Sequence, residues 1–272
     1  MHRRELLGAA AGAVLAPFLF EKASFPKPRR LGVQLYTLRD RVAAALQRTL
    51  EQVAAIGFRE VEFAGYFDHP PSRLRRWLDE AGLTAPAAHL PLDDPKLDIE
   101  ATLDVAAILG HSYVILASLP QEQQASLQGF RQAAIRLNEV GRVARAHGMR
   151  VAYHNHDFEF RWLAGVHPYT LLLHETDPDL VDMEVDVYWM TRAGEDPVRY
   201  FQEYPGRFRL CHLKDLDHGG NITEVGSGQI DFRRILAEGD TAGLRHFFIE
   251  HDRPRDSLDS VRSSYNYLRR LA

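Results

Sequence analysis

Chemically versatile side chains recur along the 272-residue chain, each at the end of a short apolar run. They are Glu62, His89, His154-Asn155-His156, Asp186, His212-Leu213-Lys214-Asp215 and Glu250-His251-Asp252. The opposite ends of these runs begin with residues that carry no such chemistry: Leu31, Phe58, Thr84, Met149 and Phe208. Random surface polarity would not favour one end, so the pattern predicts that the versatile side chains converge on a single site.

Four of these side chains suit a metal ion. Asp186 and Glu250 offer carboxylate oxygens, His212 offers an imidazole nitrogen, and His154 is placed to be the fourth ligand. Oxygen and nitrogen ligands without a thiolate favour one divalent ion such as Mn, Zn, Co or Fe over a structural zinc. Each residue alone has a simpler explanation, since Asp186 could cap a helix and a lone histidine is often a hydrogen-bonded core residue. Four such coincidences at one rim are rarer than one, so we expect a metal site.

Alternating apolar runs and amphipathic stretches are the elements that must position these groups. We predict strands at 31–36, 58–63, 84–90, 113–117, 149–154, 181–187, 208–213 and 246–249, and helices at 42–56, 72–81, 99–109, 121–147, 169–175, 197–203, 232–238 and 258–271. Eight such units over ~240 residues predict an α/β fold, a single (β/α)8 TIM barrel at 31–272, with its active site at the C-terminal ends of the strands. An open doubly wound sheet would usually carry a glycine-rich turn after its first strand, and residues 34–40 contain no glycine.

Composition excludes several classes of protein. Apolar residues make up 45% of the chain and charged residues 26%, as in a globular enzyme and unlike a disordered chain, a coiled coil or a multi-span membrane protein. The charge sum, 33 − 37 = −4, lacks the basic excess of a nucleic-acid-binding protein, so we expect no nucleic-acid partner. Cys211 is the single cysteine, which excludes an internal disulfide and a cysteine-based zinc cluster.

The first 25 residues differ from the rest. Arg3-Arg4 precede an uncharged apolar stretch from Leu6 to Phe20, and ~15 such residues suit an export signal. The twin arginine is typical of the route that carries folded proteins, so we expect a periplasmic or otherwise exported protein, with residues 26–30 as a linker. Two alternatives stay open: a mildly basic N-terminus of a cytoplasmic protein, and an uncleaved membrane anchor, since no clean cleavage site follows Phe20.

Five segments resemble the sugar phosphate isomerase/epimerase superfamily, the xylose-isomerase-like TIM barrels related to endonuclease IV. They are residues 32–39 (GVQLYTLR), 153–160 (YHNHDFEF), 186–189 (DVYW), 212–215 (HLKD) and 249–250 (IE), and the resemblance covers about residues 31–271. It implies one divalent metal, held by a glutamate on the fifth strand, an aspartate on the sixth, a histidine on the seventh and a glutamate on the eighth. Asp186, His212 and Glu250 match the last three.

The chain departs from this family pattern at two positions. The fifth-strand glutamate falls on His154, so either His154 is the ligand or the nearby Glu159 replaces the missing carboxylate. The family often has a histidine where this chain has Trp189, which supplies a flat apolar wall suited to a sugar ring. With two carboxylates instead of three, the ion should be a stronger Lewis acid.

The resemblance implies an isomerase or epimerase acting on a sugar or keto-sugar through an enediolate, whose charge the metal stabilises. Glu250 would be ligand and base, with His156 or Glu159 as the partner acid/base. Lys214 would either steady a developing oxyanion or form a salt bridge with Asp215 or Glu184. The expected substrate-binding residues are Tyr36, Glu62, His89, Asn155 and Trp189, although core packing explains Tyr36 and Trp189 nearly as well.

Three other functions are consistent with parts of the pattern. His154 and the export signal favour a metal-dependent lyase or hydrolase of keto-glycosides. The missing fifth-strand glutamate would also fit a sugar-binding barrel that has lost catalysis. A phosphodiesterase of the endonuclease IV type is disfavoured, because it needs three metals and the histidine that Trp189 replaces.

Overall fold

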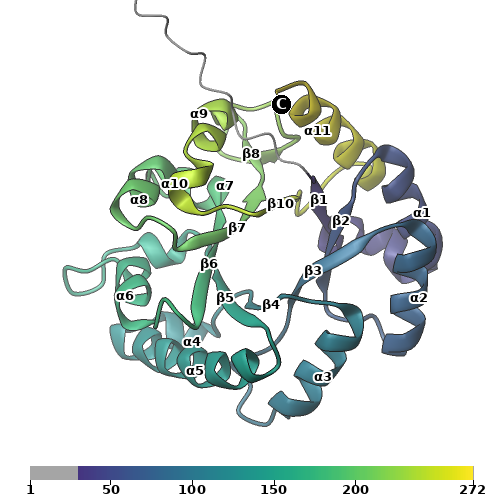
Figure 1. Ribbon diagram of the computed structural model, residues 1–272. Helices are drawn as coiled ribbons and strands as arrows, with labels where there is room; N and C mark the ends of the chain where they lie inside the picture. Colours follow the sequence, from purple (N-terminus) through teal and green to yellow (C-terminus); the bar gives the residue numbers. More distant parts are fainter. Residues whose placement is uncertain (1–29, 272) are drawn as a thin grey trace, which may run out of the picture.

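The computed structural model describes residues 30–271, which form a closed barrel of eight parallel strands inside a ring of helices (Figure 1). The strands are β1 (Gly32–Gln34), β2 (Glu60–Ala64), β3 (Thr84–His89), β4 (Tyr113–Leu116), β5 (Arg150–His154), β6 (Val181–Asp186), β7 (Phe208–Leu213) and β10 (His246–Ile249). They pair in chain order, and β10 closes the ring against β1. The predicted (β/α)8 barrel is confirmed. The expected export signal and most of the linker lie outside the described residues.

The helices follow the strands around the outside of the barrel. They are α1 (Arg39–Ile56), α2 (Pro71–Ala81), α3 (Ile99–Leu109), α4 (Gln121–Gln124), α5 (Leu127–Ala146), α6 (Pro168–Glu175), α7 (Val187–Arg192), α8 (Pro197–Glu203), α9 (Phe232–Ala237), α10 (Gly239–Ala242) and α11 (Ser257–Leu271). Asp98 caps α3 by accepting a hydrogen bond from the backbone N–H of Ala101. Gly110 ends that helix in the left-handed region, at φ 78°.

Local structure differs from the prediction in four places. The strand expected at 31–36 ends at Gln34, and a 3-10 helix, Leu35–Leu38, follows it, with the side chain of Gln34 accepting from the backbone N–H of Tyr36. The helix expected at 121–147 is two helices, because Ser126 is extended and its hydroxyl caps α5 at Gly129. The strand expected to end at 187 gives way to α7 at Val187. A short antiparallel pair, β8 (Asp215–Leu216) and β9 (Ile222–Thr223), occupies the loop after β7.

Two apolar layers support the site. Side chains that point outward from the strands, such as Val33, Val61 and Val185, pack in the core between barrel and helices. A second, smaller cluster fills the barrel interior and comprises Ala87, Tyr113, Ile115, Ala152, Leu210 and Phe248. The polar side chains lie two residues further along the chain than these apolar ones, on the same face and at the C-terminal ends of the strands: His89 after Ala87, His154 after Ala152 and His212 after Leu210. Within residues 30–271, no helix is both long enough and apolar enough to cross a bilayer.

Candidate active site

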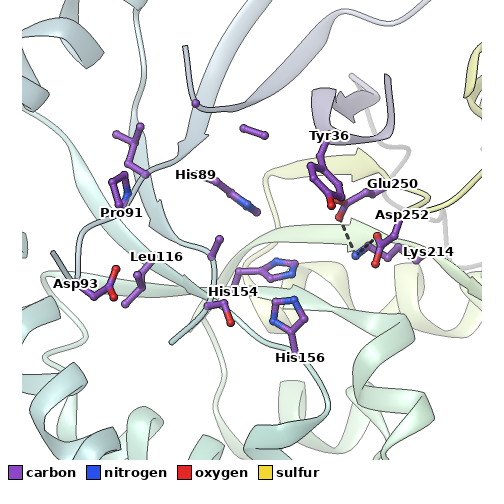
Figure 2. Close-up of a pocket in the computed structure, with 15 residues that line it drawn as sticks. Tyr36, His89, Pro91, Asp93, Leu116, His154, His156, Lys214, Glu250 and Asp252 are labelled. Carbon is purple, nitrogen blue, oxygen red and sulfur yellow. Dashed lines mark ion pairs between the residues drawn. The ribbon is translucent and has the colours of Figure 1, made fainter. Parts of the chain in front are cut away.

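A cavity of about 620 Å³ opens at the C-terminal ends of the strands. Six of the expected site residues line it: Tyr36, His89, His154, His156, Lys214 and Glu250. Figure 2 shows Lys214, Glu250 and Asp252 on one side of the cavity, and Pro91 and Leu116 on the other, with the two histidines of β5 and its loop between them. The cavity therefore joins a side where a lysine meets two carboxylates to a side where Pro91 and Leu116 lie near the carboxylate of Asp93.

His212 links the cavity to the barrel interior. Its ring is fully buried, with Nδ1 2.6 Å from Oε2 of Glu250 and Nε2 2.5 Å from Oε2 of Glu62. Gln34 donates a hydrogen bond of 2.7 Å to the same oxygen of Glu62. Burial alone would lower the pKa of His212, but the carboxylates of Glu184, Glu62 and Glu250 raise it well above its usual value. In the absence of a metal, the imidazole is therefore a cation among carboxylates.

Glu184 is a central residue that the sequence analysis considered only as a salt-bridge partner for Lys214. Its carboxylate is fully buried, and Oε2 lies 2.7 Å from Nε2 of His89, 3.1 Å from Nδ1 of His154 and 3.2 Å from Nε2 of His212. Three imidazoles thus surround one carboxylate oxygen. The other oxygen, Oε1, has no hydrogen-bond partner among the described residues.

Asp186 uses its two carboxylate oxygens differently. Oδ1 accepts hydrogen bonds of 3.0 Å from the backbone N–H groups of Tyr188 and Trp189, and so caps α7. Oδ2 accepts no hydrogen bond from the described residues, and it lies 3.0 Å from Nζ of Lys214 and 3.7 Å from Nε2 of His154. Helix capping and a place among the donors are therefore compatible in this residue.

Lys214 is a buried cation beside three carboxylates. Its Nζ atom lies 2.9 Å from Glu250 Oε2, 3.0 Å from Asp186 Oδ2 and 2.9 Å from Asp252 Oδ1, and its side chain is 2% exposed. Burial alone would lower the pKa of Lys214, but these carboxylates raise it well above its usual value. The ammonium group therefore stays protonated at the edge of the cavity.

The alternative salt bridge expected between Lys214 and Asp215 or Glu184 is not the pairing observed. The carboxylate of Asp215 instead accepts backbone hydrogen bonds from Leu216, Gly226, Gly228 and Ile230, at 2.8 to 3.1 Å. Asp215 thus holds the loop that follows β9, and Lys214 is left to the cavity carboxylates.

Glu159 lies outside the cavity lining. It is fully buried, where Oε1 accepts a hydrogen bond of 2.7 Å from the hydroxyl of Tyr153 and Oε2 one of 2.9 Å from the backbone N–H of His156. Burial raises the pKa of Glu159 to about 8. The residue holds the backbone that carries His156 into the cavity, and the structure does not bring it to the metal donors.

Three more expected substrate-binding residues are not part of the cavity lining. Glu62 is fully buried beneath His212. The amide of Asn155 is occupied by the backbone of Asp186, from whose N–H it accepts at 3.0 Å and to whose carbonyl it donates at 3.3 Å. Trp189 is half-buried, with its ring centroid 5.6 Å from Nζ of Lys214.

Tyr36 and His156 do reach the cavity. Tyr36 is 44% exposed, and the guanidinium of Arg39 lies 4.3 Å from its ring centroid. The ring of His156 stacks on Phe158 at 5.7 Å, and its buried Nδ1 has no partner among the described residues. Burial, together with the charge of Lys214, lowers the pKa of His156 to about 3, so this imidazole is neutral.

The donor chemistry around His212 fits a divalent cation. Potential ligand atoms lie within 4.8 Å of one another in two groups: Asp186, His212 and Glu250; and His89, His154, Glu184 and His212. The carboxylate oxygens Glu62 Oε1 and Glu184 Oε1 accept no hydrogen bond from the described residues, whereas Asp186 Oδ2 is paired with the ammonium group of Lys214. Such buried oxygens cost free energy unless a cation or donor compensates them. Oxygen and nitrogen donors together suit Mn, Zn, Co or Fe.

Protonation states favour ligand behaviour at two of these positions. Burial and the neighbouring His212 lower the pKa of His154 well below its usual value, which leaves the neutral imidazole that metals bind. Burial alone would raise the pKa of Glu250, but Lys214 and His212 lower it well below its usual value. Glu250 is therefore ionised where it faces the cavity.

Known proteins share this fold and parts of this sequence. A family model described as xylose isomerase-like TIM barrel matches residues 50–271, which include the metal-donor groups above. An inosose dehydratase from Lacticaseibacillus casei is 24% identical over 236 residues, or 70% of this chain and 76% of that protein. A sugar phosphate isomerase/epimerase structure from Parabacteroides distasonis ATCC 8503 aligns with a TM-score of 0.77 at 26% identity, over 88% of this chain and 97% of that one. The structure of an IolI protein with a bound zinc atom aligns with a TM-score of 0.72 at 14% identity, over 89% and 97%.

Proposed function

The chain belongs to the xylose isomerase-like TIM barrel family, and on this premise we propose that it is a divalent-metal-dependent isomerase or epimerase of a sugar or keto-sugar. The family acts on small sugar-like substrates. The observation that carries the proposal is the buried set of carboxylates and imidazoles directly beneath the cavity, with a protonated lysine at its edge. Of the two donor groups, we assign the ion to Asp186, His212 and Glu250, with His154 as the fourth ligand.

A divalent ion held there would polarise the carbonyl group of a bound keto-sugar and acidify the neighbouring C–H. Glu250 is ionised and faces the cavity, so its carboxylate can accept that proton. Lys214 can donate a hydrogen bond to the oxygen on which negative charge develops. Return of a proton to the opposite face of the same carbon gives an epimer. Return of a proton to the former carbonyl carbon, with loss of the neighbouring hydroxyl proton, gives an aldose–ketose isomer.

His156 is the better candidate for the partner acid/base, because it lines the cavity whereas Glu159 does not. Its neutral ring has one nitrogen that can donate a hydrogen bond and one that can accept, and the residue lines the cavity. We assign it the substrate hydroxyl next to the carbonyl. Tyr36 at the mouth of the cavity offers a half-exposed ring on which a sugar can stack.

A lyase is the second candidate, and the inosose dehydratase relatives favour it. Elimination begins with the same loss of a proton beside a carbonyl, but a hydroxyl or a glycosidic oxygen then leaves from the next carbon. The two-carboxylate donor set that His154 creates would give a stronger Lewis acid, which assists such a step. Product analysis separates the two reactions, because an isomer keeps the mass of its substrate and a dehydration product loses water.

Metal removal and reconstitution test the proposal. Protein stripped by a chelator is reloaded with Mn, Zn, Co or Fe and incubated with keto-sugars, an inosose and keto-glycosides. We expect turnover only in the reloaded protein. A metal-loaded protein that binds these compounds but changes none of them would instead be a sugar-binding barrel.

We also propose that the chain is exported, with any membrane contact made through an uncleaved signal. The support is the Arg3-Arg4 pair and the apolar stretch after it. Replacing both arginines by lysine preserves their charge, and we expect it to retain the protein in the cytoplasm. Unchanged recovery outside the cytoplasm would show that this pair is not an export signal.

A further inference from the structure

Three fully buried carboxylates beside the donor histidines do not line the cavity: Asp186, which the proposed function assigns to the ion, and Glu62 and Glu184. Glu62 and Glu184 each contact a histidine that belongs to the donor set. A carboxylate that cannot touch substrate, and that a folding chain must desolvate, needs a partner that compensates its charge.

Glu62 contacts one of the two ring nitrogens of His212. Its Oε2 atom lies 2.5 Å from Nε2 of His212, and the second ring nitrogen, Nδ1, lies 2.6 Å from the cavity-lining Glu250. Gln34 donates to the same Oε2 at 2.7 Å and so holds the carboxylate in place. With a proton on Nε2 shared with Glu62, Nδ1 is the nitrogen left for the ion.

Glu184 likewise contacts one ring nitrogen of His154, but here the contacted nitrogen is Nδ1 and not Nε2. Its Oε2 atom lies 3.1 Å from Nδ1 of His154, whereas Nε2 of that ring lies 3.7 Å from Oδ2 of Asp186. His89 donates to or shares a proton with the same Oε2 at 2.7 Å. The proton of His154 therefore belongs on Nδ1, and Nε2 faces the donor set.

We infer that Glu62 and Glu184 are positioning residues that select the metal-facing nitrogen of each histidine, Nδ1 in His212 and Nε2 in His154. A metal-bound imidazole usually donates its other N–H to a carboxylate, which fixes its tautomer and raises its basicity. The inference rests on the proposed metal dependence. It makes Glu184 a hydrogen-bond acceptor, so its group with His89 and His154 does not hold a second ion.

The ring tautomers test this assignment directly. Two-bond 1H–15N correlation spectra of the zinc-loaded protein distinguish protonated from metal-bound ring nitrogens. We expect one zinc per chain, with His212 protonated on Nε2 and His154 protonated on Nδ1. The opposite tautomer in either ring, or two zinc ions per chain, would overturn the inference while leaving metal dependence intact. A chain that takes up no divalent ion would overturn both.

Variants separate positioning from general stability. Glu62→Gln should weaken zinc binding about 10- to 100-fold and disturb the His212 signals, and Glu184→Gln should do the same for His154. Because a glutamine oxygen can still accept a hydrogen bond from the ring N–H, Glu184→Leu should lose more zinc affinity than Glu184→Gln. Unchanged affinity and tautomers in the Gln and Leu variants would contradict the positioning role.

Glu60→Gln is the matched control. Glu60 lies on the same strand as Glu62, is also buried, and pairs with a histidine, since its Oε2 is 2.9 Å from Nδ1 of His246. Neither residue of that pair belongs to a donor group. We expect Glu60→Gln to leave zinc affinity unchanged. An equal loss of affinity in this variant would mean that removing any buried carboxylate weakens the site, and the inference would fail.

Discussion

The ammonium group of Lys214 lies 2.9 Å from Oε2 of Glu250, a carboxylate that both lines the cavity and contacts His212. One carboxylate thus faces a permanent cation on one side and an imidazole on the other. The pairing keeps Glu250 ionised and places a hydrogen-bond donor beside any oxygen that approaches it. In the proposed reaction, Lys214 stabilises charge on the substrate and is not itself a ligand.

Lys214→Met tests this division of roles. Methionine has a similar length but carries no charge, so we expect kcat to fall about 100- to 1,000-fold, as when an oxyanion donor is removed. Metal content should stay close to one ion per chain, because no ligand is lost. Steady-state kinetics and metal analysis of the same preparation separate the two roles. Loss of the ion together with activity would show that Lys214 is needed for metal binding and would contradict a role limited to the substrate.

Asp186→Asn tests the donor set without breaking the helix that follows. The amide oxygen can still accept from the N–H groups of Tyr188 and Trp189, so α7 keeps its cap. The carboxylate charge at Oδ2 is removed, and we expect the divalent ion to be lost on dialysis. His212→Ala should release it as well. Full occupancy in both variants would show that the ion is bound elsewhere or not by these residues.

The fifth-strand departure from the family pattern can be resolved with three variants. His154→Ala should release the metal, whereas Glu159→Gln should retain it, because Glu159 is engaged by Tyr153 and the backbone of His156. His154→Glu restores the usual carboxylate and should also retain metal. If Glu159→Gln loses the ion and His154→Ala keeps it, Glu159 is the fourth ligand and the two-carboxylate argument fails.

Strand positions were the most predictable part of the fold. All eight predicted strands overlap observed ones, because continuous apolar runs are what a strand buried on both faces requires. Helix breaks caused by a single capping residue were harder to predict. Ser126 lies within a stretch of helical periodicity, yet its hydroxyl serves α5 better as a cap than as an interior residue. The loop that contains the β8–β9 pair is held by the carboxylate of Asp215, which accepts hydrogen bonds from the backbone N–H groups of Gly226 and Ile230, 11 and 15 residues further along the chain.

Residues at the C-terminal rim were predictable because every strand of such a barrel ends there. Glu184 was missed because only the last position of each strand was considered. Residues two apart on a strand share a face, so Glu184 points into the barrel with Asp186 and lies one layer deeper. The same layering explains Glu62, which was expected to bind hydroxyls but lies beneath His212. How deep a side chain lies within the barrel depends on the register between neighbouring strands. The residue pattern of a single strand gives no information on that register.

Stability should depend on pH through His111, which is not part of the cavity lining. Its Nδ1 contacts the carbonyl oxygen of Ala85 at 2.6 Å, its Nε2 has no partner among the described residues, and burial lowers its pKa to about 4. In the unfolded chain the pKa of this histidine has its ordinary value of ~6.5, so between pH 4 and pH 6.5 the unfolded chain binds more protons than the folded one. The contribution of neutral His111 to the free energy of unfolding is therefore complete above pH ~6.5 and is lost as the pH falls toward 4.

Replacement of His111 by phenylalanine should flatten this dependence. Between pH 8 and pH 5, the free energy of unfolding should fall by about 2 kcal/mol more in the wild-type protein than in His111→Phe. Denaturant titrations of both proteins at the two pH values give the comparison. Equal losses would mean that His111 is protonated in the folded state without cost.

Hydrogen exchange beside a carbonyl is the most direct test of the proposed chemistry. The metal-loaded protein is incubated in D₂O with the keto-sugar, inosose and keto-glycoside panel, and deuterium at the carbon next to the carbonyl is followed by NMR. We predict deuterium incorporation that a chelator abolishes and that added Mn, Zn, Co or Fe restores. Product formation with no incorporation of solvent deuterium, or the absence of exchange with every one of these metals, would contradict metal-assisted proton abstraction as the function of this barrel.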